Sequence, residues 1–413
     1  MIDWDVAVST GVRWARPGPQ VSLAEARRCV TELRELAGSV HGPVQEVSGL
    51  TSPESSGRVA VVDRPGWIRG NVDGFQVVLE PLVKHLRESG EGRLPGFTAP
   101  GTLLGSVGSR VTGMQVGLIL AYLAGRVLGQ YELFLPPEPG TAGPLQPADG
   151  TVGGAANGAT PDGAAPTAAA SNAAASNGAA AAGAAPDGRL TLVAPNILMV
   201  ERELNVNPHD FRLWVCLHEE THRVQFTAVR WLRGYVQRQM TDFLLASDLD
   251  PAAILDRLRA AGGAVAGAVR GGDGEGAPPS LLEAIQNPRQ RVVLDRLTAV
   301  MTLVEGHGDY VMDAVGPQVV PSVEQIRSRF TARRNTAGRI EQALRRILGI
   351  DLKMKQYAEG SRFVRTVIDE IGVAGFNRVW GSPETLPTRE EITNPRAWMN
   401  RVPGGGALAA GES

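Results

Sequence analysis

Two histidines and a glutamate lie close together in the run LHEETH, residues 217–222. His218 and His222 are four residues apart, so on a helix both side chains project from one face, one turn from each other. Two imidazoles in this arrangement suit a zinc ion, and Glu219 can reach a zinc-activated water without binding the metal. The pattern predicts a catalytic zinc site, although a helix that binds no metal can carry the same short motif.

A catalytic zinc needs a third protein ligand and one open position. The pattern with a third histidine requires glycine at 225 and histidine at 228, but Gln225 and Ala228 stand there, which excludes that class. In the run LTAVMTLVEGHGDYVMDAVG, residues 297–316, Glu305 ends an apolar helical stretch. An isolated charge there is costly to bury unless it is paired or bound to a metal, so we predict Glu305 as the third ligand.

Three neighbours of Glu305 are further candidates. Asp309, one helical turn on, is predicted to accept the second ring proton of a liganding histidine, the alternative being an ordinary polar stripe. His307 is the rival third ligand, but on a regular helix it points about 200° away from Glu305, so we predict a contact to substrate or transition state instead. Tyr310 could donate to an oxyanion, with simple packing as the alternative.

The motif lies on a helix with a clear start signal. Asn207 is a predicted N-cap, with Pro208 at the first helical position and Asp210 at the third. Ser22 and Glu25 form a capping box for an earlier helix. Helical spacing is expected at 22–39, 113–130, 228–246, 251–260, 289–314, 322–335, 337–348 and 355–371.

Three short runs have the composition of strands: RVAVVD (58–63), YELFLPP (131–137) and RLTLVAPN (189–196). The segment 136–188 between the last two is nearly all small or polar residues, so it cannot offset its ordering entropy and is expected to be a disordered insertion. Without it, the two runs can pair in a small sheet. RLTLVAPN is our candidate edge strand for holding an extended peptide by main-chain pairing.

These elements predict a mainly α fold of the α+β class, a helical bundle with a small β-sheet beside the motif helix. Residues 1–135 are expected to form its N-terminal helical part and residues 189–400 its catalytic part. A flexible loop near 260–279 and a flexible tail at 401–413 complete the predicted organisation.

Composition excludes several classes of partner. The 41 basic and 43 acidic residues give a net charge of −2, so the protein has no excess positive charge that would attract nucleic acid or an anionic membrane. The apolar run 113–129 contains Arg126 and is too short to span a bilayer. Cys29 and Cys216 are too few for a disulfide scaffold, and Cys216 is expected to be a buried apolar residue. Without a signal-peptide pattern, we expect a cytoplasmic protein.

Three runs together resemble one known family: RLTLVAPNILMVERELNVNPHDFRLWVCLHEETHRVQFTAVRWLR, VEGHGDYVMDAVG and LAGRVLGQYELFLP. They are similar to the zincin-like family of actinobacterial proteins often labelled coenzyme F420 biosynthesis associated, over most of the chain outside the low-complexity insertions. The resemblance implies a mostly helical zincin fold of the glutamate-ligand kind, with His218, His222 and Glu305 as zinc ligands. It also implies Glu219 as general base, but no known substrate.

Two features depart from well-studied zinc peptidases. Glu220 stands where their extended motif prefers an uncharged residue, which puts the local electrostatics in question. The separation of His222 from Glu305 is longer than usual, which the low-complexity segment 260–279 partly explains. Neither departure removes a ligand.

The residues therefore predict a zinc-dependent metallopeptidase that hydrolyses amide bonds. Zinc would lower the pKa of its water to about 7 and polarise a carbonyl, while Glu219 would take the water's proton and pass it to the leaving amine. The alternatives are a zinc amidase acting on a small molecule, and a non-catalytic scaffold that retains zinc. Glu219 argues against the scaffold, because a structural zinc needs no general base.

Overall fold

The computed structural model describes residues 2–52, 58–88, 103–135, 188–246, 287–335 and 350–402. Met1–Leu135 and Asp187–Ser413 group into one structural unit. Several predicted segments lie outside the described residues: the insertion up to residue 187, the helices at 251–260 and 337–348, the loop near 260–279, and residues 403–413 of the tail.

A three-stranded sheet forms in the order β1-β3-β2. β1 (Arg58–Val62) runs parallel to β3 (Arg189–Val193), whereas β2 (Gly129–Glu132) runs antiparallel to β3. In the second pairing Glu132 lies opposite Arg189, and the Arg189 guanidinium bonds to the Glu132 carboxylate at 2.6 Å. The predicted pairing of the two runs that flank the insertion is confirmed.

The strand order corrects the prediction for residues 189–196. β3 pairs with β1 on one side and with β2 on the other, so its main-chain groups have no free side for a peptide. The edge-strand prediction was wrong because the run at 58–63, whose partner could not be recognised from the sequence, occupies that side. Among the described residues, β1 and β2 are the edges of the sheet.

The motif helix, α7, spans Pro208–Ala228 and begins as predicted. The Asn207 side chain accepts a hydrogen bond from the Asp210 N–H at 3.2 Å, which satisfies one of the free donors of the first turn. A carboxylate at Asp210 also suits the positive end of the helix dipole. The start of α7 is therefore set by local sequence.

Most other predicted helices are present with shifted ends. They are α2 (Leu23–Ser39), α8 (Arg230–Leu245), α11 (Pro288–Val319), α12 (Val323–Asn335) and α14 (Ile350–Phe376). The helix expected at 113–130 is α5 (Leu103–Ala124), which starts earlier and ends before the chain enters β2. No helix in the described part of the chain is long and apolar enough to cross a membrane.

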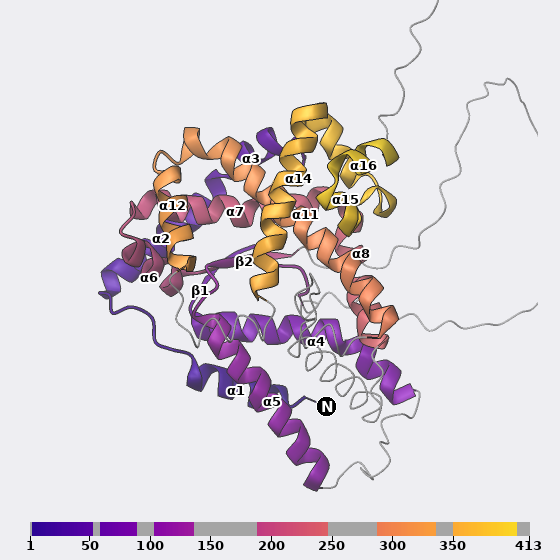
Figure 1. Cartoon of the computed structure of the whole chain (residues 1–413). Coiled ribbons are helices and arrows are strands. Elements are labelled where there is room, and N and C mark those ends of the chain that lie inside the picture. The colour runs from indigo at the N-terminus through magenta and orange to yellow at the C-terminus, as the bar shows by residue number, and fades with distance from the viewer. Residues whose placement is uncertain are drawn as a thin grey trace, which may run out of the picture. The chain divides into compact units, whose positions relative to one another are not determined.

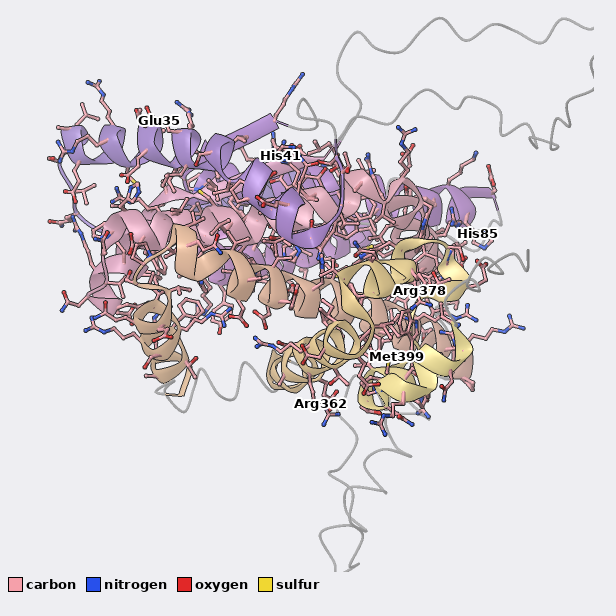
Figure 2. The ribbon with its side chains drawn as sticks, turned by 90° about the horizontal axis from the view of Figure 1, so that it is seen from above. Glu35, His41, His85, Arg362, Arg378 and Met399 are labelled. Atoms are coloured by element: carbon pink, nitrogen blue, oxygen red, sulfur yellow. The ribbon has the colours of Figure 1, made fainter. Side chains whose placement is uncertain are left out.

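The remaining helices complete a mainly α fold with a small sheet, as predicted. They are α1 (Trp4–Trp14), α3 (His41–Ser48), α4 (Arg64–Glu88), α6 (Ala194–Leu204), α15 (Arg389–Thr393) and α16 (Pro395–Arg401), with single 3₁₀ turns at Asn377–Trp380 and Pro383–Thr385. The C-terminal elements, α14 to α16, pack together at one side of the molecule, where Arg362, Arg378 and Met399 are labelled in Figure 2.

The sheet lies between α7 and α4 (Figure 1). α7 packs against β2 and β3, and α4 packs against β1 and β3. The motif helix thus has an edge strand, β2, directly beside it. The small sheet beside the motif helix is confirmed.

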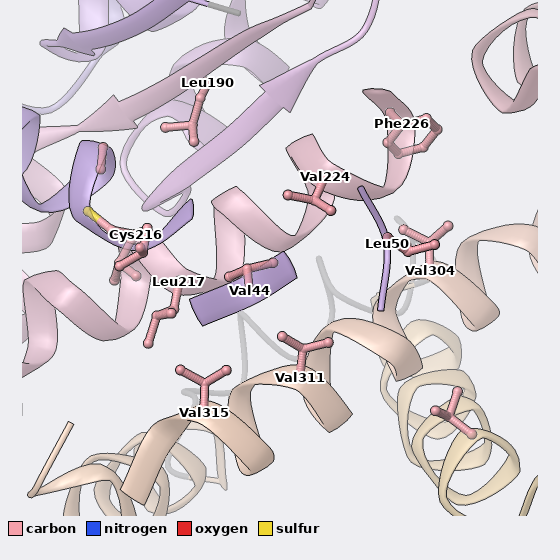
Figure 3. Packing of buried hydrophobic residues seen from close by; sticks show 14 of the residues in the cluster. Val44, Leu50, Leu190, Cys216, Leu217, Val224, Phe226, Val304, Val311 and Val315 are labelled. Atoms are coloured by element: carbon pink, nitrogen blue, oxygen red, sulfur yellow. The ribbon is translucent and has the colours of Figure 1, made fainter. Parts of the chain in front are cut away.

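The main apolar core joins α7 to α11 (Figure 3). Leu217 and Val224 of α7 face the side of α11 that carries Val311 and Val315, and Val44 of α3 lies between the two helices. All five side chains are almost completely buried. Because apolar burial contributes about 1.5–3 kcal/mol for a large side chain, this seam holds the two helices in a fixed register.

α11 and α14 approach each other closely through two glycines. A Cβ atom at Gly306 would lie 2.2 Å from the carbonyl carbon of Gly360, and one at Gly360 would lie 2.1 Å from the backbone oxygen of Thr302. No side chain fits at either position unless the helices separate. Gly306 directly follows Glu305, so this contact also supports the predicted third ligand.

We predict that Gly360→Ala lowers the free energy of unfolding by about 1–3 kcal/mol, because the added methyl group forces two packed backbones apart. Gly38→Ala on α2 is the matched control: no atom lies within 4 Å of its Cβ position, so the same change there should stabilise the protein by up to about 1 kcal/mol. Urea unfolding measures both. Equal effects of the two substitutions would contradict the close-packing interpretation.

Candidate metal centre

The three predicted ligands come together in space. His218 and His222 on α7 face Glu305 on α11, and their ligand atoms form one compact group. The two Nε2 atoms lie 3.2 Å apart, and Glu305 Oε2 lies 3.8 Å from His218 Nε2 and 3.7 Å from His222 Nε2. Residues separated by more than eighty positions in the sequence thus form one small triangle of donor atoms.

This triangle has the size that zinc requires. A point equidistant from the three atoms lies about 2.1 Å from each, the distance at which imidazole nitrogens and carboxylate oxygens bind zinc. Two imidazoles and one carboxylate are also a donor set of catalytic zinc sites, which leaves a fourth position for a water molecule or substrate. The residues present therefore fit the ion.

Both imidazole rings present Nε2 to the triangle because their Nδ1 atoms face the protein. His222 Nδ1 lies 2.9 Å from Gln225 Oε1, and His218 Nδ1 lies 3.1 Å from Met312 Sδ. The rings stand nearly perpendicular, at 84°. Gly308, facing the two rings from α11, leaves room beside them, since even a Cβ there would be 3.6 Å from the nearest ring atom.

Glu219 lies beside the triangle but is not part of the three-residue ligand group. Its side chain packs against β2: a Cβ atom at Gly129 would lie 2.6 Å from Glu219 Cγ and 2.8 Å from its Oε1. The residue is only 5% exposed. Burial first, and then the negative charge of Glu305, raise the pKa of Glu219 well above its ordinary value. A carboxylate in this environment is a stronger proton acceptor than one in water.

Glu220 points away from the triangle into a buried polar cluster. The Arg223 guanidinium donates to both Glu220 oxygens at 2.7 Å, and His41 Nδ1 lies 2.6 Å from Glu220 Oε1. A carboxylate only accepts, so His41 donates this bond from Nδ1. The charge that departs from the usual extended motif is therefore paired within the protein, on the opposite side of α7 from the imidazoles.

The other side of His41 is held by Gln45 of the same helix. Gln45 Oε1 accepts from the Ser52 N–H at 2.8 Å, so its amide group faces His41 Nε2, 2.7 Å away. Gln45 therefore donates to His41 Nε2, while His41 donates from Nδ1 to Glu220. The cluster therefore links α3 to α7 through the contacts from Gln45 to His41 and from His41 to Glu220.

His307 does not join the predicted ligands. It is 1% exposed, its ring stacks on Phe376 at 5.3 Å and meets Trp380 edge-on, and its Nδ1 lies 2.9 Å from Gln225 Nε2. Burial, and to a smaller extent the charge of His222, lower the pKa of His307 to about 3. The ring is thus a neutral, enclosed group behind Gln225, and its predicted contact to substrate does not fit this position.

Tyr310 and Asp309 lie on the same helix as Glu305 and His307, α11, whereas Cys216 lies on α7. Tyr310 is half-buried and packs against the main core, in agreement with its packing interpretation. Asp309 lies one turn beyond Glu305 and lines a cavity of about 590 Å³ together with Trp214 and Arg327. Its bond to a liganding histidine stays a prediction. Cys216 is buried, as predicted, and burial raises the pKa of its thiol.

Sequence reasoning missed the role of Gln225. The residue entered only as the mismatch that excluded a third-histidine pattern, yet it is fully buried and contacts the second predicted ligand. Its position three residues after His222 places it one helical turn on, which is the signal that could have identified it.

Comparison with known proteins decides the family. The model of the zincin-like metallopeptidase family matches residues 2–399. The chain belongs to this family. A crystal structure from Chloroflexus aurantiacus, described as "a putative hydrolase with a novel fold", is similar to this zincin-like protein with a TM-score of 0.61 and 27% sequence identity, over 98% of this chain and 100% of that one. A search of curated proteins found no match to this chain. The resemblance to zincin-like proteins is thus confirmed at the level of the family.

We predict that Glu220→Gln lowers the free energy of unfolding of this zincin-like protein by about 3–5 kcal/mol, because it leaves the buried Arg223 charge without its partner. Glu203→Gln is the control, since Glu203 pairs with Arg333 at the surface, where half of the Glu203 side chain is exposed, and loss of this pair should cost at most about 1 kcal/mol. Denaturant unfolding of both variants gives the comparison. A Glu220 variant as stable as the Glu203 variant would show that the buried pair contributes little.

Proposed function

We propose that this zincin-like protein is a zinc-dependent metallopeptidase in which His218, His222 and Glu305 hold the ion. The observation that carries the proposal is the triangle of three donor atoms. Beside it lies a buried fourth side chain, the carboxylate of Glu219, which is not one of the three ligands. The family match and the hydrolase description of the similar structure also support hydrolysis.

Zinc, when bound, supplies a Lewis acid that acidifies a water molecule and polarises a carbonyl group. Glu219 accepts a proton from the attacking water and then delivers it to the nitrogen of the leaving amine as the C–N bond breaks. Its raised pKa suits both steps, since the carboxylate binds the proton firmly enough to accept it and still releases it to a more basic amine. Glu219 is therefore the proposed general base and acid.

β2 is the proposed support for the substrate. It is an edge of the described sheet, it packs against α7, and its Gly129 touches the Glu219 side chain. An extended peptide that pairs with β2 would run past the proposed base with its main chain held by hydrogen bonds. This role was assigned to residues 189–196 from the sequence, and β2 replaces them because β3 is paired on both sides.

A strand edge of the described sheet beside the base favours a peptide over a small amide, which has no main chain to pair. A non-catalytic scaffold is disfavoured because nothing in a structural zinc site requires a carboxylate at the position of Glu219. We therefore place peptide hydrolysis ahead of both alternatives.

Metal content and activity of three proteins test the assignment. The wild type should bind zinc stoichiometrically. Glu305→Ala should lose zinc, whereas Glu219→Gln should retain zinc and lose about 10²–10⁴-fold in turnover of a peptide library, because only the proton transfer is removed. Glu324→Ala, which changes an exposed glutamate of α12, is the control and should behave as wild type. Undiminished zinc in Glu305→Ala would sink the ligand assignment.

The contact with β2 gives a second prediction. Gly129→Ala should reduce kcat by about 10²-fold with zinc content unchanged, because the added methyl group displaces the Glu219 carboxylate from its place beside the triangle. Metal analysis and steady-state kinetics on the same preparation separate the two effects. Unchanged kcat would show that the position of Glu219 does not depend on this glycine.

A further inference from the structure

Gln225 uses every hydrogen-bonding group of its side chain inside the protein. It is completely buried at the end of α7 that carries the metal ligands. Its Oε1 lies 2.9 Å from His222 Nδ1, while its Nε2 lies 2.9 Å from both the Val304 carbonyl oxygen and His307 Nδ1. Two protons on Nε2 and one acceptor at Oε1 account for all three contacts.

The contact to Val304 decides which way the amide points. A backbone carbonyl only accepts, so the atom facing it must be the amide nitrogen. The carbonyl oxygen of Gln225 then faces His222, and His222 must donate from Nδ1. With its proton on Nδ1, the neutral ring has its lone pair on Nε2, the atom that faces His218 and Glu305.

His307 holds the amide from the other side. Gln225 donates to His307 Nδ1, so the single proton of this ring lies on Nε2. The ring itself is held by Phe376, on which it stacks, and by Trp380, which it meets edge-on. A reversed amide would place an N–H against the His222 proton and an oxygen against both acceptors, so the arrangement has one consistent orientation.

We propose that Gln225 is a positioning residue that selects the metal-binding tautomer of His222, and that His307 acts through Gln225 as its anchor. The inference rests on the metal site of the proposed function. It assigns a role to the histidine that sequence analysis placed among the substrate contacts, and it explains why a buried amide stands one turn beyond the motif.

Tautomer detection by ¹⁵N NMR on the metal-free wild-type protein is the first test. The chain has six histidines, which single substitutions can assign. We expect His222 protonated on Nδ1 and His307 on Nε2, each as one tautomer. A His222 ring protonated on Nε2, or a mixture of both tautomers, would overturn the proposal.

Zinc affinity of three variants, measured by chelator competition, is the second test. Gln225→Leu and His307→Phe should each bind zinc about 10- to 100-fold more weakly, the usual effect of removing a partner of a metal ligand. His307→Phe keeps an aromatic ring against Phe376 but loses the acceptor. His307→Asn loses the ring but keeps an acceptor near the place of Nδ1, and should recover most of the affinity and the single His222 tautomer.

The opposite order, with the Phe variant near wild type and the Asn variant impaired, would show that His307 serves packing alone and overturn its role as anchor. If Gln225→Leu does not fold, the His307 pair carries the test. Failure of the proposed function looks different: a wild type that binds no zinc would refute the metal site, while the tautomers of the metal-free protein would still decide the roles of Gln225 and His307.

Discussion

The apolar seam between α7 and α11 is the constraint on which the site depends. It buries Leu217 and Val224 against Val311 and Val315, and so fixes how far each helix lies along the other. The register of the seam brings Glu305 to within 3.8 Å of both imidazoles. The glycine contact between α11 and α14 then holds the other side of α11, so that the carboxylate is positioned by packing from two directions.

Three buried polar residues of α7 each contact a different element. Glu219 lies against Gly129 of β2, Glu220 bonds to His41 of α3, and Gln225 bonds to His307 of α11. Since neighbouring residues on a helix point about 100° apart, α7 contacts the strand β2, the helix α3 and the ligand-bearing helix α11 at once. Buried polar groups are costly singly, and hydrogen bonds offset that cost at Glu220 and Gln225.

Two glutamines, Gln45 and Gln225, each orient a histidine in the same way. Gln45 presents its nitrogen to His41 because its oxygen accepts from Ser52, so His41 donates to Glu220. Gln225 presents its oxygen to His222 because its nitrogen donates to Val304. In each case a backbone group that can only donate or only accept decides the orientation of the glutamine amide. The orientation of the amide then decides which nitrogen of the histidine ring donates.

The sequence by itself determined the motif helix, its start at Asn207, the mainly α class and the residues that could bind zinc. These depend on local signals: helical spacing, an N-cap and the ligand chemistry of histidine and glutamate. It also predicted that the two runs flanking the insertion pair with each other. Without the insertion these runs are adjacent along the chain, and adjacent strands commonly pair. Only the tertiary structure decided which strand is an edge, that His307 lies behind Gln225, and that Glu220 meets His41 of α3. Each of these depends on contacts between elements far apart in the chain, and such contacts are set by how apolar faces pack, which leaves no pattern in any one segment.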